Sequence, residues 1–285
     1  MIESKGISVS ALGLGLACAA MAQNFASVGD TLSAREQILF GLPGAAALSA
    51  ASLLFSGLAM RYRIFESGTA LSRCANAAFL LWFGAELART VLDAQSVCRQ
   101  QFGSNALIGL LPLLVLLSGW MENHAYNYTA RILWWLLLAA GAVCVIGLAG
   151  QMHWQRLFGP ETGSVWQTPL PQLALYPEYF SLAFLCTRGR ERSGAFLPFW
   201  AFGIQAGYSL ALELVLGRMR SPDYTGLELL RAWGFGFFSR LDAVLILIWL
   251  AIALFRICFL CSCIQLLWRR SVALVPGRAG KEGRA

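Results

Sequence analysis

The sequence predicts an all-α integral membrane protein with about eight transmembrane helices in one bundle. Of its 285 residues, 58% are hydrophobic, only 13% are charged and 10 are Trp, and the mean hydropathy is +0.61. Such a composition is typical of polytopic membrane proteins. Apolar runs of about 18 to 24 residues recur throughout and leave no room for a separate aqueous core. We therefore expect one transmembrane domain, 1–270, followed by a basic and disordered cytoplasmic tail, 271–285.

Eight apolar runs approach the length of about 20 residues that a helix needs to cross the hydrocarbon core. In chain order they are Ile7–Gln23, Ile38–Met60, Leu71–Leu92, Ala106–Trp120, Ala130–Gly150, Leu173–Thr187, Ala195–Leu216 and Leu241–Trp268. The first, fourth and sixth runs are short. In transporters such spans are often broken helices that hold a ligand, although a misplaced boundary is the simpler explanation for the fourth run.

The basic residues predict the orientation of the bundle. An even number of spans places both termini on one side, and 13 of the 22 basic residues then fall on that side. Cytoplasmic loops carry an excess of Lys and Arg, so we expect both ends in the cytoplasm. Loop anchoring explains the net charge of +7, and no basic patch on a soluble module indicates a nucleic-acid partner.

The sequence does not indicate an enzyme. It contains no GxxxxGK[ST], GxSxG or HExxH motif. Cys258, Cys261 and Cys263 resemble part of a zinc site, but no second cysteine pair or nearby histidine completes four ligands. We expect these thiols to pack as small apolar groups. No catalytic residue, metal or cofactor is therefore expected.

Ionisable residues at membrane depth are the candidates for function. In the third run, Glu86, Arg89 and Asp93 share one helix face, so Arg89 can pair with either carboxylate. A self-neutralised helix end is the alternative. In the sixth run, Glu178 follows Pro177. A proline removes a backbone donor and favours a break, where a carboxylate can meet a ligand amine.

Further charges lie toward the predicted outer side. Glu213 is near the end of the seventh run, and Arg240 and Asp242 lie at the start of the eighth. With Glu86 and Glu178, these groups would line a vestibule that is open to the exterior.

Arg256 lies within the most apolar part of the chain, where an isolated charge costs about 2.5–3.5 kcal/mol on insertion scales. It shares a face with Asp242, Trp249 and Cys263 at intervals of seven residues, but Asp242 is about 21 Å away along the helix. Its partner should be a carbonyl freed by a broken helix, Gln205, or a carboxylate closer to it than the span depths suggest. The alternative is that Arg256 extends to the cytoplasmic surface.

The segment 212–267 resembles the B subunits of spore germinant receptors, the endospore germination permease family of the amino acid/polyamine/organocation superfamily. The matching residues are Leu216-Gly217, Tyr224-Thr225-Gly226-Leu227-Glu228-Leu229-Leu230-Arg231, Gly236-Phe237-Phe238-Ser239-Arg240-Leu241-Asp242-Ala243 and Ile248-Trp249. Ile7-Ser8, the third-run pattern GTALSR…LWFGAELAR and Tyr176-Pro177-Glu178 match more loosely. The chain departs from the family by lacking the last two of ten spans and the proline after the Gly-rich break of the first span.

The resemblance implies a truncated, LeuT-like bundle in which broken helices 1 and 6 enclose a small-molecule site near the midplane. The implied ligand is a nutrient, in particular an amino acid. The implied partners are the A and C subunits of the receptor, in the inner membrane of a bacterial spore. The expected ligand-binding residues are Glu86, Tyr176, Glu178, Arg240, Asp242 and Arg256, of which Arg256 is chosen on membrane energetics alone.

Three classes of function follow from these observations. The first is a ligand-sensing receptor subunit, in which binding biases a helix rearrangement that a partner detects. The second is a proton-coupled transporter of amino acids or organic cations, in which Glu86 or Glu178 takes up the proton. The third is a membrane scaffold whose site degenerated with the loss of two helices.

Overall fold

The computed structural model describes residues 8–26, 34–62, 64–65, 69–103, 105–121, 123–155, 175–181, 194–216, 229 and 241–273, and all regular structure among them is helical. The longer helices are α1 (Val9–Ala26), α2 (Ala34–Arg61), α3 (Ala70–Phe102), α4 (Ala106–Trp120), α5 (Asn123–Leu148), α8 (Leu197–Leu216) and α10 (Leu241–Ala273). Two 3-10 turns, η1 (Ala149–Gln151) and η3 (Pro177–Tyr179), are also described. The all-α fold class is therefore confirmed for the part of the chain that is described.

Seven of the eight expected runs each overlap one of these helices, and α4 has the expected bounds. The sixth run differs. Within 175–181 the backbone is extended at Tyr176 and then forms the η3 turn. Pro177 occupies the first position of this turn, where its missing N–H is not needed. The described part of this run is therefore not α-helical, and its residues 173–174 and 182–187 lie outside the described residues.

Two expectations for the first and last helices are wrong. α1 is continuous from Val9 to Ala26, so the break that the resemblance implied for helix 1 is absent. α10 continues to Ala273, so the first three residues of the expected tail are helical; residues 274–285 lie outside the described part of the chain.

The third run was expected to end at Leu92, but α3 continues for another ten residues to Phe102. Its ends are defined by local hydrogen bonds. The Thr69 side chain accepts from the Ser72 N–H at the start, and Gly103 at the end has φ 63° with its N–H bonded to the Arg99 carbonyl. A left-handed residue after a helix favours glycine because no Cβ is present.

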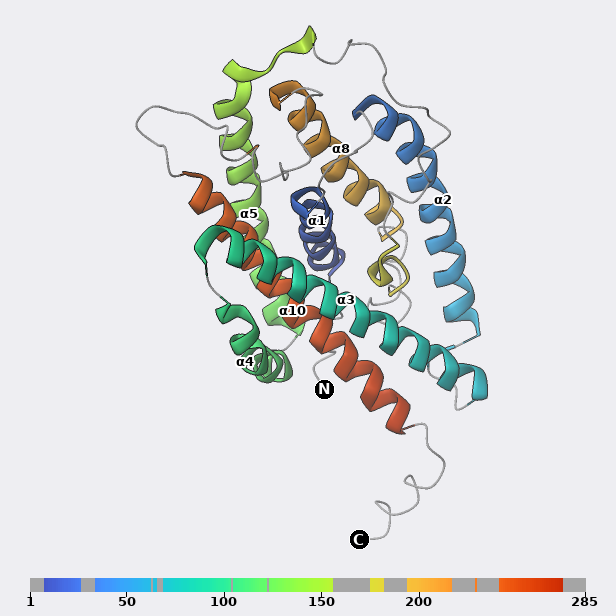
Figure 1. Cartoon of the computed structure of the whole chain (residues 1–285). Helices are drawn as coiled ribbons and strands as arrows, with labels where there is room; N and C mark the ends of the chain where they lie inside the picture. The colour runs from blue at the N-terminus through green and yellow to red at the C-terminus, as the bar shows by residue number, and fades with distance from the viewer. Residues whose placement is uncertain are drawn as a thin grey trace, which may run out of the picture.

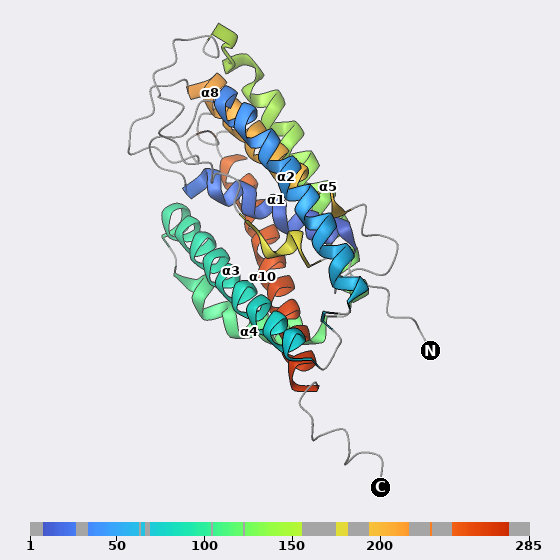
Figure 2. The same cartoon turned by 90° about the vertical axis from the view of Figure 1, so that its right-hand side faces the viewer.

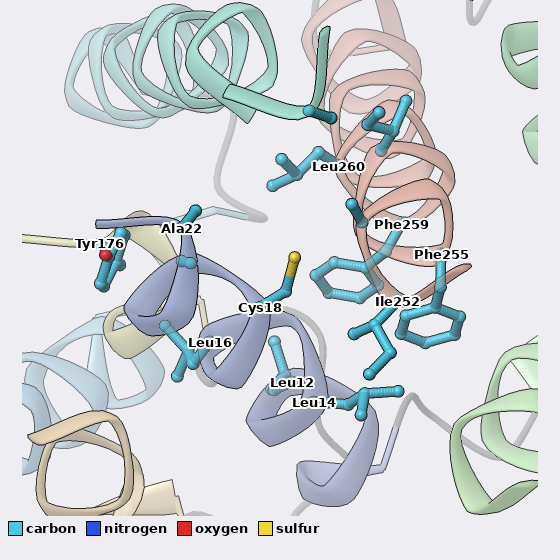
Figure 3. Packing of buried hydrophobic residues seen from close by; sticks show 14 of the residues in the cluster. Leu12, Leu14, Leu16, Cys18, Ala22, Tyr176, Ile252, Phe255, Phe259 and Leu260 are labelled. Carbon is cyan, nitrogen blue, oxygen red and sulfur yellow. The ribbon is translucent and has the colours of Figure 1, made fainter. Parts of the chain in front are cut away.

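The helix α10 lies at the centre of the bundle and contacts α1, α3, α4 and α5, while α8 packs between α1 and α2 (Figure 1). From the side, α3 and α4 lie on one side of α10, and α2 and α8 lie on the other (Figure 2). α1 is buried on every face from residue 11 to residue 20, as expected for a helix that is apolar all round. In Figure 3, α1 packs its apolar side chains toward Phe255 and Phe259 of α10.

The outer helices expose their apolar side chains. In the described part of the chain, three segments are long and apolar enough to cross a membrane: Gln37–Arg61, His124–Gln151 and Ala243–Ser271. Of their most apolar stretches, 67% is buried in α10 but only 18% in α2 and 17% in α5. Large exposed apolar surfaces mark contact with lipid or protein. This distribution is consistent with a membrane protein in which α10 is the internal helix.

The contact between α2 and α8 gives the first testable prediction. A Cβ at Gly41 would lie far inside the van der Waals radius of the Phe202 ring, whereas a Cβ at Gly57 on the same helix would meet nothing within 4 Å. We expect Gly41→Leu to destabilise the protein by about 1–3 kcal/mol through overpacking. The control, Gly57→Leu, should leave stability unchanged or higher. Unfolding of the detergent-solubilised variants is the measurement, and equal stability of the two would contradict this packing.

Candidate functional site

The site is a buried ion pair in the middle of the bundle. Arg256 of α10 donates hydrogen bonds from Nε at 3.0 Å and from Nη2 at 2.7 Å, both to Oε1 of Glu178. The side chains are 3% and 0% exposed, respectively. Arg256 therefore does not extend to the cytoplasmic surface. Its partner is one of the expected possibilities, a carboxylate closer than the span depths suggest.

The 3-10 turn holds Glu178 in place. After the turn, the Phe180 N–H bonds to the Pro177 carbonyl, and Ser181 donates to the Glu178 carbonyl from its N–H at 3.3 Å and its Oγ at 2.8 Å. From α2, the Ser52 hydroxyl donates to the Tyr179 carbonyl. These bonds satisfy backbone carbonyls that a helix would have used internally, as burial requires.

Helix α3 contributes Thr90 and Glu86 to the surroundings of the ion pair. We refer to Arg256, Glu178, Thr90, Glu86 and Tyr176 together as the cluster. Thr90 Oγ1 accepts from Arg256 Nη1 at 2.9 Å and donates to the Glu86 carbonyl one turn earlier at 2.8 Å. The Glu86 side chain is buried on the same face of α3 and acts electrostatically on Arg256. Its Oε2 has no hydrogen-bond partner.

Tyr176 and Gly15 complete the surroundings of the arginine. The Arg256 guanidinium carbon lies 5.3 Å from the centre of the Tyr176 ring, a cation–π distance. The Tyr176 hydroxyl is buried and has no hydrogen-bond partner. On the other side, a Cβ at Gly15 of α1 would lie 3.6 Å from Arg256 Cγ. Gly15 therefore allows α1 to pass close to the arginine stem.

Four of the six expected site residues are thus brought together: Glu86, Tyr176, Glu178 and Arg256. The other two are not placed. Arg240 lies outside the described residues, and Asp242 lies in the first turn of α10 with a side chain that is outside them. The mouth of the expected outer vestibule, where Arg240 and Asp242 would lie, is thus outside the described residues.

Two other expected carboxylates have separate structural roles. Asp93 is 3.9 Å from Arg89 on the exposed side of α3, which matches the self-neutralising pair considered for this helix. Glu213 of α8 accepts from the Ala34 N–H at 2.6 Å, at the first residue of α2. A carboxylate at a helix N-terminus accepts a hydrogen bond from a free backbone N–H and interacts favourably with the helix dipole.

Thr90 was not identified from the sequence. Its signal was its spacing, because it lies four residues after Glu86 and so on the same helix face. A threonine at membrane depth is common enough, however, that this spacing alone did not single it out.

The arrangement can bind a polar group but does not resemble a metal centre. Among the described residues, no three His, Cys, Asp or Glu side chains are grouped as metal ligands. Comparisons of the chain with models of known families, with curated proteins and with solved structures find no match. The function must therefore be argued from the cluster itself.

The ion pair gives the second prediction, a double-mutant cycle. Arg256→Leu or Glu178→Leu alone should destabilise the protein by about 3–5 kcal/mol, because each leaves a buried charge without its partner. The double variant should recover most of this loss, since an apolar pair of similar volume is often neutral or stabilising. Unfolding of the four detergent-solubilised proteins measures the coupling energy. Two additive single effects would show that the charges do not interact.

Proposed function

We propose that this chain is a multi-pass membrane protein that recognises a small polar nutrient at the Arg256–Glu178 cluster. The observation that carries the proposal is a fully buried ion pair beside three buried oxygen atoms that have no partner, those of Glu86, Glu178 and Tyr176. Intramembrane ionisable groups are expensive and usually functional. Three neighbouring buried oxygens without a partner call for an explanation, and a bound ligand is the one proposed here.

The proposed topology has seven long helices crossing the bilayer, with segment 175–181 forming the interruption in an eighth crossing. The exposed apolar faces of α2, α4 and α5 support it, since they suit the lipid-facing surface of a bundle. Non-helical backbone at membrane depth is tolerated only where it is buried in protein or lines a polar cavity. Segment 175–181 meets this condition, because Tyr176, Pro177, Glu178 and Tyr179 are all buried.

The ion pair supplies a mechanism for sensing. It connects the 3-10 turn to α10, and through Thr90 to α3. A ligand that bonds to Glu178 or Arg256 competes with this pair and so changes the position of the turn relative to the two helices. Shifting a two-state equilibrium from 1:99 to 99:1 takes about 5.5 kcal/mol. Removing one partner of a buried ion pair costs about 3–5 kcal/mol, which is of the same order as this shift.

In its finer form, the proposal is that the chain is the nutrient-sensing B subunit of a spore germinant receptor. The resemblance of 212–267 to that family supports it, together with the Tyr176-Pro177-Glu178 motif, which lies in the cluster. The partners would be the A and C subunits, and the location the inner spore membrane. A spore-forming host with A and C genes beside this one would favour the finer proposal.

A proton-coupled transporter of amino acids or organic cations is the second candidate. The specific observation in its favour is Glu86, a buried carboxylate with an unpartnered oxygen next to a fixed ion pair. Such a group could take up and release a proton during transport. Uptake of radiolabelled amino acids into proteoliposomes under a pH gradient distinguishes this candidate from a receptor, which should bind without net uptake.

The third prediction tests the role of Glu178. Glu178→Gln keeps the shape of the side chain and removes the charge that balances Arg256, so the response to nutrient should be lost while the protein remains in the membrane. The measurement is germination of complemented spores, with the membrane level checked by immunoblot. Asp93→Asn, a carboxylate of the Arg89 pair outside the cluster, is the matched control and should respond normally. Normal germination of Glu178→Gln spores would rule out the proposed role.

A further inference from the structure

The charges in the cluster do not balance. It contains one guanidinium, that of Arg256, and two buried carboxylates, those of Glu178 and Glu86. The nearby Arg89 and Asp93 form a pair of their own and contribute no net charge. Tyr176 and Cys18, which also act electrostatically on Arg256, carry no charge in their ordinary protonated forms. With both carboxylates ionised, the cluster therefore has one negative charge in excess.

The hydrogen-bonding capacity is also unbalanced, and in the same sense. Three buried oxygen atoms have no partner: Oε2 of Glu86, Oε2 of Glu178 and the hydroxyl of Tyr176. Arg256 does not bond to these three atoms: its Nε and Nη2 donate to Glu178 Oε1, and its Nη1 donates to Thr90. A buried acceptor left without a donor is unfavourable, and more so when it is charged. The two carboxylate oxygens can only accept while they are ionised, and the Tyr176 hydroxyl can accept or donate, so a donor is the group that the site lacks.

An ammonium group matches both deficits at once. It carries one positive charge and three N–H donors, and it accepts no hydrogen bond. The Tyr176 ring is already in contact with the Arg256 guanidinium, so its hydroxyl is the part of the side chain left for a ligand. A carboxylate would match neither deficit, because it adds a second uncompensated negative charge in a medium of low dielectric.

We propose that the cluster recognises the ammonium group of its ligand, at Glu86 and Glu178 Oε2 beside the Tyr176 hydroxyl. This inference rests on the proposed function and adds the substrate class: compounds with a free primary amine. An amino acid binds through its amino end, and its carboxylate lies away from the two glutamates. Amines that lack a carboxylate are ligands too, whereas acids that lack an amine are not.

The experiment compares matched ligands on the purified full-length protein. Three pools are tested for thermal stabilisation in detergent: the standard amino acids, the same compounds N-acetylated at every amino group including that of the Lys side chain, and the amines that result from their decarboxylation. The amino acids and the amines should both raise the melting temperature, since binding to the native state alone stabilises it. The N-acetylated pool, which has no ammonium group, should produce no shift.

A variant separates the excess carboxylate from the ion pair. Glu86→Gln removes the uncompensated charge and leaves the bonds between Arg256 and Glu178 intact, so affinity for the best single ligand should fall at least about 30-fold, equivalent to ~2 kcal/mol. Asp93→Asn, a carboxylate on the same helix outside the cluster, should retain wild-type affinity. Circular dichroism of the unliganded proteins checks that each variant is folded. If Glu86→Gln does not fold, the comparison of the three ligand pools on the wild-type protein still decides whether the ammonium group is recognised.

The outcomes distinguish this inference from the proposed function. Equal stabilisation by the N-acetylated pool, or wild-type affinity in Glu86→Gln, overturns recognition of the ammonium group and leaves nutrient binding in place. Wild-type affinity in Glu86→Gln would be expected if Glu86 carries a proton and takes no part in binding. Stabilisation by no pool overturns both the ammonium inference and nutrient binding at the cluster.

Discussion

The ion pair between Arg256 and Glu178 is the interaction on which the arrangement of the bundle depends. An arginine in an apolar helix core requires a charged partner, because its burial alone costs more than the packing around it returns. The partner is 78 residues away in the chain and lies on a segment that cannot be helical through Pro177. The pair therefore dictates where segment 175–181 must lie. Thr90 extends the same constraint to α3, and Gly15 extends it to α1, which passes against the arginine stem.

A buried ion pair is weak support for stability but strong support for a defined arrangement. Apolar side chains of similar volume would often stabilise a bundle as well or better. They would not specify which segment packs against the middle of α10. In a membrane this matters more than in water, since lipid is as apolar as the helix surfaces and gives little drive toward one packing. We infer that the pair is kept for the position it enforces and for the chemistry of the groups beside it.

The helices could be predicted from the sequence because length and apolarity are local properties. The predicted bounds of α4 were correct. The run predicted for α3 was too short, because the last turns of this helix are more polar than a lipid-facing helix would be. The sixth run could not be assigned in the same way. Apolar residues around Pro177 are compatible with a helix, a turn or extended backbone, and the choice depends on Ser52 and Arg256, which lie on other helices.

The candidate site, like the fold, could be predicted from the sequence only in part. The chemistry of Glu86, Glu178 and Arg256 is visible in the sequence, since charged residues stand out in an apolar run. The sequence does not show that these three residues meet in space. Seven-residue spacing related Arg256 to Asp242 on one helix, yet spacing along a helix says nothing about the depth of a neighbouring segment. The sequence could therefore suggest a carboxylate partner but could not choose among the acidic residues.

The geometry of the pair argues against a purely structural role. Arginine and a carboxylate pair most strongly as two forks, with parallel bonds to both oxygens. Here Nε and Nη2 both bond to Oε1, and Oε2 of Glu178 remains buried without a partner. A pair selected only for stability would use the second oxygen, because an unsatisfied buried acceptor is costly. The unused oxygen lies in the same cluster as the unused Oε2 of Glu86 and the hydroxyl of Tyr176. Together these atoms form a set of acceptors whose cost is offset only when a donor enters the site.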